Sequence, residues 1–269
     1  SINSNEMITD GFSAMEDTDI SGTSVLPSEI KWTNVKEQFS YYDIVGDYVF
    51  DENNVQYVQL AKGTQILSWI QDENAKDSYN RTSLVYSVNK FDGNGWSVPK
   101  RVGGQIERGD FYPQMVSDGN KAYLVWNRAA EKFDSEMEAK GGIDYALKHM
   151  DVCFSVYDAE QDSSFSEPLI VSSQNDFTEF TPKVTAENGK VAVSWFINSE
   201  NDIEYYDGTN SIYVTEYEDE SFSESKCYAK APNGYGLKDY DLKIVNGKPV
   251  IAYISDGDGN QMTNDSVVH

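Results

Sequence analysis

The chain of 269 residues contains only two histidines and two cysteines. With His149 and His269 alone, a zinc site or a histidine-based catalytic triad has almost no residues from which to form. Cys153 and Cys227 lie in apolar or strand-like stretches, and a domain of this size needs no disulfide. We therefore expect two buried free thiols and no zinc.

Basic residues are also scarce, because 21 Lys and Arg stand against 45 Asp and Glu, for a formal net charge of −24. Such a charge repels phosphate backbones and anionic lipids, so we predict no nucleic-acid partner. No apolar run approaches the roughly 18 residues that span a bilayer, and no membrane insertion is expected. The acidity attracts cations, calcium included, or serves solubility alone.

Residues 1–27 have neither a basic region nor an apolar region, so they do not read as a signal peptide, and the chain does not begin with Met. We interpret this segment as an N-terminal extension or linker, and the chain as a processed protein or a piece of a longer one. The whole chain is 39% hydrophobic and 13% aromatic, which is typical of a folded domain.

Two sequence markers recur together along the chain. Apolar runs that end in an aromatic residue, such as "AYLVW" at Trp126, recur at intervals of 57, 69 and 58 residues, at Trp69, Trp126, Trp195 and Tyr253. An aromatic residue followed by Ser recurs at intervals of 57, 69 and 57 residues, at Phe39, Trp96, Phe165 and Phe222. Because the two markers drift together, the chain contains a true internal repeat.

Each repeat reads as a four-stranded antiparallel meander. A Gly or Asn lies six residues before each aromatic marker, where a tight hairpin needs positive φ, at Gly63, Asn120, Gly189 and Gly247. Prolines open the first strand or lie in the fourth, which places these strands at the sheet edges. Such sheets stacked around an axis form an all-β fold, the β-propeller, and the aromatic markers would be buried between its blades.

The motif of a Pro, an acidic turn, Lys and Trp, followed by "GWSVP" or "SFSEP", resembles the bacterial β-propeller repeats of the sialidase-like, neuraminidase-repeat type. The aspartate box of that family is degenerate here, because "SVNKFDGNGW" at 87–96 keeps its residue types at a different spacing. The resemblance implies a sialidase-like propeller. In an active member, an arginine triad would hold a substrate carboxylate, and Arg81, Arg108 and Arg128 match that role in number and in loop position.

We predict a propeller over residues 28–256 and a flexible C-terminal tail over 257–269. The chain begins with strands three and four of a repeat and ends with strands one and two. These could form one composite blade that closes a four-bladed wheel, or the chain could be part of a larger wheel. Closure removes exposed sheet edges, which favours the closed form.

Long loops follow the second and fourth strands of each repeat, and both sets emerge at one end of the wheel, where binding residues usually lie. The loop after Trp126 is 12 residues longer than its counterparts, and its helix-forming residues predict a short helical insertion near 129–142. Phe133 and Met137, four residues apart, would share one side of that helix. The insertion could equally be a surface decoration on its own blade.

The same loops collect aromatic, arginine and acidic residues that suit capture of a glycan or protein. The candidate ligand-binding residues are Tyr79, Arg81, Arg108, Asp110, Phe111, Tyr112, Arg128, Phe177, Tyr205, Tyr206 and Tyr235. A weak calcium pattern comprises Asp256, Asp258 and Asn260, but it lacks the Gly and Glu of a calcium loop. No cofactor is otherwise expected.

No catalytic residue can be singled out among the 45 acidic residues. We predict a non-catalytic binding or scaffold domain of a secreted or cell-surface bacterial protein, which presents its long-loop end to a glycan or protein. The alternative is a sialidase-like enzyme that processes glycosides.

Overall fold

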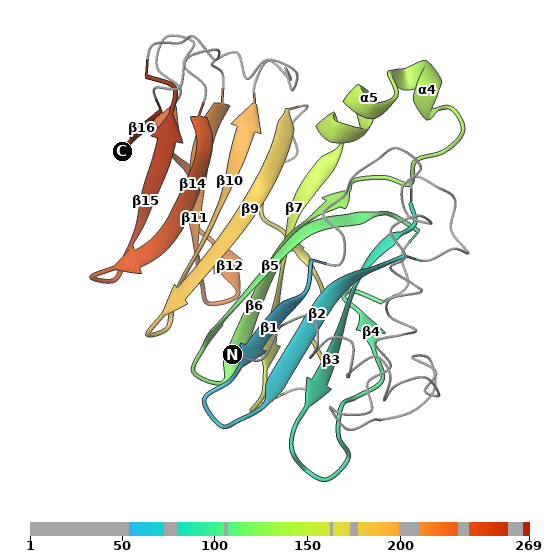
Figure 1. Cartoon of the computed structure of the whole chain (residues 1–269), viewed down its shortest axis with the longest axis vertical. Coiled ribbons are helices and arrows are strands. Elements are labelled where there is room, and N and C mark those ends of the chain that lie inside the picture. The colour runs from blue at the N-terminus through green and yellow to red at the C-terminus, as the bar shows by residue number, and fades with distance from the viewer. Residues whose placement is uncertain are drawn as a thin grey trace, which may run out of the picture.

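The computed structural model describes residues 54–72, 80–104, 107–161, 164–172, 177–198, 210–230, 237–257 and 266–269. Within them the chain is almost entirely β, and four antiparallel sheets follow one another along the sequence (Figure 1). The fold prediction is confirmed as a β-propeller with four blade-like sheets. Residues 1–27 and the strands expected within 28–53 lie outside the described residues.

The first two sheets have four strands each, in the order of the chain. The first comprises β1 (Gln56–Gln59), β2 (Gln65–Asp72), β3 (Thr82–Asn89) and β4 (Lys100–Arg101). The second comprises β5 (Asp110–Asp118), β6 (Lys121–Ala129), β7 (Met150–Asp158) and β8 (Leu169–Ile170). Strands one and four are the edges, as the prolines predicted.

The third sheet has the same meander, and an additional strand pairs with β11. It comprises β9 (Thr178–Glu187), β10 (Lys190–Asn198), β11 (Asn210–Glu218), β12 (Ser221–Phe222) and β13 (Lys226–Lys230). The fourth sheet comprises β14 (Leu237–Val245), β15 (Lys248–Ser255) and β16 (Val267–Val268).

The hairpins between first and second strands lie where the repeat predicted them. Asn188 and Gly189 both have positive φ, at 51° and 82°, and Asn246 and Gly247 repeat this at 51° and 75°. Such turns match the twist of the flanking strands. In the second sheet Gly119, at φ 57°, supplies the positive φ that we had assigned to Asn120.

The serine of the second marker forms the same set of hydrogen bonds in three sheets. In the second sheet the Val156 N–H donates to Ser166 Oγ at 3.0 Å, and the Ser155 hydroxyl donates to the Ser166 carbonyl at 2.6 Å. Equivalent bonds join the third strand to the marker serine at Ser87, Val88 and Ser97 and at Thr215, Glu216 and Ser223. The marker serine therefore attaches the short fourth strand to the sheet.

Replacing Ser155 by Ala should lower the free energy of unfolding by about 1 kcal/mol, because the Ser166 carbonyl would lose a partly buried donor. Chemical denaturation measures the change. The exposed Ser221→Ala variant is the control and should stay within about 0.5 kcal/mol of the parent. An equal effect of both changes would contradict a specific role for the Ser155 hydroxyl.

The tryptophan markers are buried between sheets, as predicted. Trp69, Trp126 and Trp195 are 2%, 0% and 1% exposed. Trp126 packs in a cluster with Leu84 and other residues of the first sheet, and Trp195 packs in a cluster that joins the second and third sheets. The prediction is wrong for Tyr253, which is only half-buried, because the fourth sheet has no further described sheet against it.

Hydrogen bonds from the first strand and from its turn join the second sheet to the third. The Val184 N–H donates to Gln114 Oε1 at 2.8 Å, which links β9 to β5. The Asp118 carboxylate accepts from the Asn188 and Gly189 N–H groups in the neighbouring turn, at 3.2 and 2.6 Å. These bonds set the position of one sheet relative to the next.

The helical insertion is present, but later in the chain than 129–142. Helices α4 (Met137–Lys140) and α5 (Ile143–Lys148) flank Gly141 and Gly142, whose positive φ values of 124° and 63° interrupt the helix. Phe133 and Met137 are both buried, but the prediction that they share one side of a helix is wrong, because Phe133 precedes α4. Asn80 bonds to both backbone groups of Phe133, at 2.7 and 2.9 Å. The insertion of the second sheet is thus attached to the first.

The end of the chain adds a strand to the fourth sheet. Val267 and Val268 pair with Ser255 and Ile254, and His269 stacks on the Tyr253 ring with centroids 4.8 Å apart. The composite blade stays a prediction, because its N-terminal strands lie outside the described residues. The sequence had predicted a tail here, and its last residues belong to β16 (Figure 1).

The two cysteines differ from each other, although we expected both to be buried. Cys153 is 3% exposed, and burial raises the pKa of its thiol to about 12. Cys227 is exposed because β13 lies at the outside of the third sheet. No helix among the described residues has the length and apolar character to cross a membrane.

Candidate functional site

The strand ends that lead into the long loops lie at one end of the sheets, and the short hairpin turns lie at the other (Figure 1). The two helices are at the long-loop end, and the hairpins at Gly63, Gly119, Gly189 and Gly247 are at the other end. The described candidates of the long-loop end are Arg81, Arg108, Asp110, Phe111, Tyr112, Arg128 and Phe177. The candidates Tyr79, Tyr205, Tyr206 and Tyr235 lie outside the described residues.

An ion pair between Asp110 and Arg128 lies at this end, where β5 begins and β6 ends. The Arg128 Nε donates to Asp110 Oδ1 at 2.7 Å, and the two side chains are 4% and 1% exposed. Asp110 also accepts from the Trp126 indole N–H and the Leu84 N–H, both at 2.9 Å. A buried charge pair is stable only with such additional hydrogen bonds.

The arginine candidates are therefore in different environments. Arg128 is bound by Asp110 and also donates to the Val102 carbonyl at 2.9 Å. Arg108 is half-buried, and its Nη1 donates to the Ala130 carbonyl at 3.0 Å. Arg81 is also half-buried. The structure uses Arg128 to join strands rather than leaving its guanidinium exposed for a ligand.

Asp151 is a buried carboxylate near Arg108 that the sequence analysis did not select. Asp151 lies opposite Arg128 in the register of β7 and β6, and it is 7% exposed. Burial raises the pKa of its carboxyl, and the nearby positive charge of Arg108 partly opposes this shift. No motif marked Asp151, since only the strand register places it beside the Asp110–Arg128 pair.

The aromatic candidates separate into buried and exposed residues. Phe111 is 7% exposed, and its ring lies so close to Gly109 that an added Cβ there would be 2.8 Å away. Tyr112 and Phe177 are 44% and 40% exposed. Phe111 therefore packs inside the protein, while Tyr112 and Phe177 can meet a ligand.

A β-bulge sets the direction of Tyr112. Phe111 and Gln114 pair with Asn127 and Val125, so Tyr112 and Pro113 lie opposite the single residue Trp126. The φ angle of Tyr112 is 52°, which is unfavourable for a bulky residue. In β9 the dipeptide at 181–182 forms the same bulge opposite Trp195. The bulge therefore recurs in two sheets, but Thr181 is half-buried in the third sheet, whereas the second sheet places an exposed aromatic ring at this position.

Of the weak calcium pattern, only Asp256 is described, and its side chain is buried at 1% exposure. Asp258 and Asn260 lie outside the described residues. Among the described residues no three His, Cys, Asp or Glu side chains converge as metal ligands.

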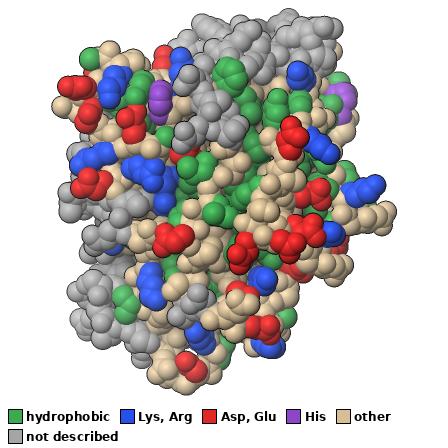
Figure 2. Space-filling view, turned by 180° about the vertical axis from the view of Figure 1, so that it is seen from behind, with side chains coloured by type: hydrophobic (Ala, Val, Ile, Leu, Met, Phe, Trp, Pro, Cys, Tyr) green, Lys and Arg blue, Asp and Glu red, His purple; other side chains and the backbone are tan. Residues whose placement is uncertain are grey.

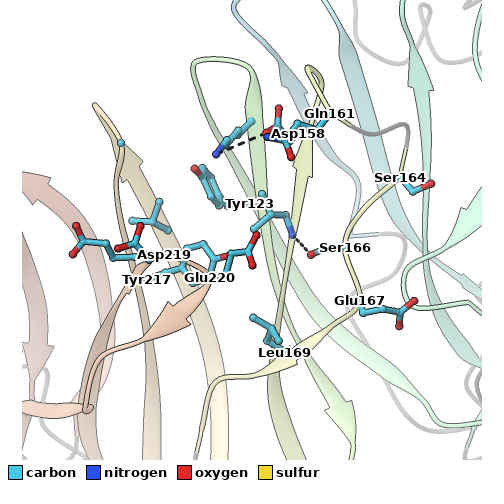
Figure 3. Close-up of a pocket in the computed structure, with 15 residues that line it drawn as sticks. Tyr123, Asp158, Gln161, Ser164, Ser166, Glu167, Leu169, Tyr217, Asp219 and Glu220 are labelled. Atoms are coloured by element: carbon cyan, nitrogen blue, oxygen red, sulfur yellow. Dashed lines mark hydrogen bonds and ion pairs between the residues drawn. The ribbon is translucent and has the colours of Figure 1, made fainter.

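A cleft that no sequence motif indicated lies at the short-turn end, between the second and third sheets (Figure 3). Its volume is about 740 Å³. Tyr123 and Tyr217 contribute rings, and the acidic residues of the cleft are Asp158, Glu167, Glu218, Asp219 and Glu220. The available sequence signal was "YEDESF", where the β11–β12 turn has Asp219 and Glu220 at φ 50° and 60° instead of Asn and Gly.

Comparison with solved structures supports the fold. The GH93 α-L-arabinofuranosidase of Fusarium graminearum, solved with arabinobiose, aligns with a TM-score of 0.51 and 11% identity over 80% of this chain. The α-L-arabinanase of Penicillium chrysogenum aligns at 0.48 and 12% identity over 76% of this chain, and Trypanosoma rangeli sialidase at 0.46 and 13%, also over 76%.

The alignments span 60%, 61% and 34% of those three proteins, respectively. No protein-family model matches the chain, and no curated protein matches it either. At such low identity, the likeness to the arabinofuranosidase establishes a shared β-propeller architecture.

Proposed function

We propose that this chain is a non-catalytic binding β-propeller of a secreted or cell-surface bacterial protein, and that its long-loop end binds a glycan. The observation that carries the proposal is Tyr112, an aromatic residue held exposed by the bulge at the start of β5. An unfavourable backbone angle combined with an exposed ring is typical of binding positions. Phe177, beside the start of the adjacent strand β9, can provide a second stacking surface.

The charges favour a neutral glycan over an acidic one. The net charge of −24 opposes an anionic ligand, and the Asp110–Arg128 pair removes one guanidinium from the three that the sialidase resemblance would need. Stacking on exposed aromatic rings with polar neighbours suits neutral sugars. The arabinofuranosidase of similar fold was solved with arabinobiose, so arabino-oligosaccharides are the first ligands to test.

A Tyr112→Asn variant should bind the glycan about tenfold more weakly, because the stacking ring is removed. Asn tolerates the left-handed backbone angle of this position, so the variant should keep the fold. A glycan array selects the ligand, and calorimetry on arabino-oligosaccharides or the selected ligand measures the change in affinity. Tyr228→Asn is the matched control, since Tyr228 is similarly exposed, at 41%, on β13.

Two outcomes would contradict the proposal. Equal loss of affinity in both variants would remove Tyr112 from the binding site. Turnover of a fluorogenic arabinoside or sialoside, abolished by Arg108→Ala, would establish the glycoside-processing enzyme instead.

A further inference from the structure

The short-turn end contains a second candidate site, the cleft between the second and third sheets. Its apolar surface comprises Val156, Leu169, Val191 and the two rings of Tyr123 and Tyr217. Five carboxylates line it against a single lysine, Lys121, which itself lies 3.8 Å from the Asp158 carboxylate. The cleft therefore combines apolar walls with a strong excess of negative charge.

The Tyr123 hydroxyl is the least expected group in this cleft. Tyr123 is only 5% exposed, yet within the described part of the chain its hydroxyl has no hydrogen-bond partner. Figure 3 shows the ring pointing into the space between the two sheets. The hydroxyl oxygen is not fully enclosed by protein atoms, so a ligand group in the cleft can form a hydrogen bond with it.

The Tyr123 phenol also stays neutral over the physiological pH range. Burial raises its pKa to about 12, and the carboxylates of Asp118 and Asp158 add to the shift. Tyr217 has a raised pKa as well, again mainly from burial, with a contribution from Glu220. Both rings therefore present neutral π surfaces beside carboxylates, which is the combination that attracts organic cations.

The carboxylates are spread around the cleft and do not converge. Among the described residues they form no group of three that could hold a metal ion. On the face shown in Figure 2, acidic side chains lie beside apolar ones, with lysine and arginine side chains interspersed among them. A distributed acidic rim over apolar walls matches lysine or arginine side chains, whose aliphatic stems cover apolar surface while the charged ends reach the rim.

We propose that this cleft binds a basic, extended peptide segment of a partner protein. The volume of about 740 Å³ is that of a site for a ligand of several side chains rather than a single ion. Leu169, in the edge strand β8, is exposed beside the cleft, and a peptide can add to such an edge through backbone hydrogen bonds. The site is separate from the glycan site of the long-loop end and does not depend on it.

The test uses the peptide Lys-Gly-Lys-Gly-Lys-amide with a neutral fluorophore attached to its N-terminus, and its binding to the whole chain is followed by fluorescence anisotropy at physiological salt. Replacing Glu218 by Gln together with Asp219 by Asn should weaken binding about tenfold, because two carboxylates of the rim are neutralised. Asn at position 219 suits the positive φ there, so the fold should be retained.

The matched control is Glu136→Gln together with Asp144→Asn, which makes the same chemical changes on exposed residues of the helical insertion at the other end. It should change the affinity less than about twofold, since screened charges at long range contribute little. If the two double variants weakened binding equally, the net charge of the protein alone would explain the attraction, and the proposal would be overturned.

Tyr123→Phe distinguishes a site from a charged surface, because it removes only the hydroxyl. It should leave the melting temperature unchanged and weaken peptide binding about fivefold. Unchanged affinity in this variant would overturn the proposal. So would equal competition by spermidine, which carries the same charge as the peptide but has no peptide backbone.

Discussion

Replacing Asp110 by Ala should lower the free energy of unfolding by about 3–5 kcal/mol, because Arg128 would remain buried without its counter-charge. The change also removes the carboxylate that accepts from the Trp126 indole N–H and from the Leu84 N–H. The bond from Leu84 joins the first sheet to the second. Urea denaturation followed by tryptophan fluorescence measures the difference.

The exposed pair of Lys62 and Glu160 provides the control for this experiment. Its side chains are 71% and 57% exposed, so Glu160→Ala should change the stability by less than about 1 kcal/mol. If Asp110→Ala were as mild as Glu160→Ala, the buried pair would not be a structural link. Arg128 would then again be a candidate for ligand binding.

Replacing Trp126 by Ala should cost about 3–5 kcal/mol, because the ring is completely buried between the first two sheets. Tyr253, the corresponding marker of the fourth sheet, is half-buried and stacks on the C-terminal His269. Tyr253→Ala should therefore cost less than half as much. Thermal and chemical denaturation of both variants test the order.

A change of less than about 0.5 kcal/mol for Trp126→Ala would contradict its place in the core. The effects of Asp110→Ala and Trp126→Ala should not add in a double variant, since the indole N–H donates to the Asp110 carboxylate. Additive effects would mean that this hydrogen bond contributes little.

The repeat and the strands within it followed from the sequence alone. Hairpin turns need positive φ, which Gly and Asn tolerate, and buried strands need apolar runs. The turn residues and the apolar runs are both local features of the sequence, so they can be recognised in each repeat. The edge positions of the first and fourth strands also followed, because proline cannot donate to a sheet ladder. The helical insertion was detected by its extra length, but its helices lie on either side of Gly141 and Gly142 and continue to Lys148.

The roles of single residues depended on the tertiary structure. Arg128 and Asp110 are 18 residues apart, and Tyr123 and Tyr217 are in different sheets, so no local pattern relates the members of either pair. The sequence suggested an exposed Phe111 and a ligand-binding Arg128, and the strand register buries both. Local periodicity determines which residues form strands. Only the packing of one sheet against the next decides which side chains stay exposed, because burial is a property of both surfaces.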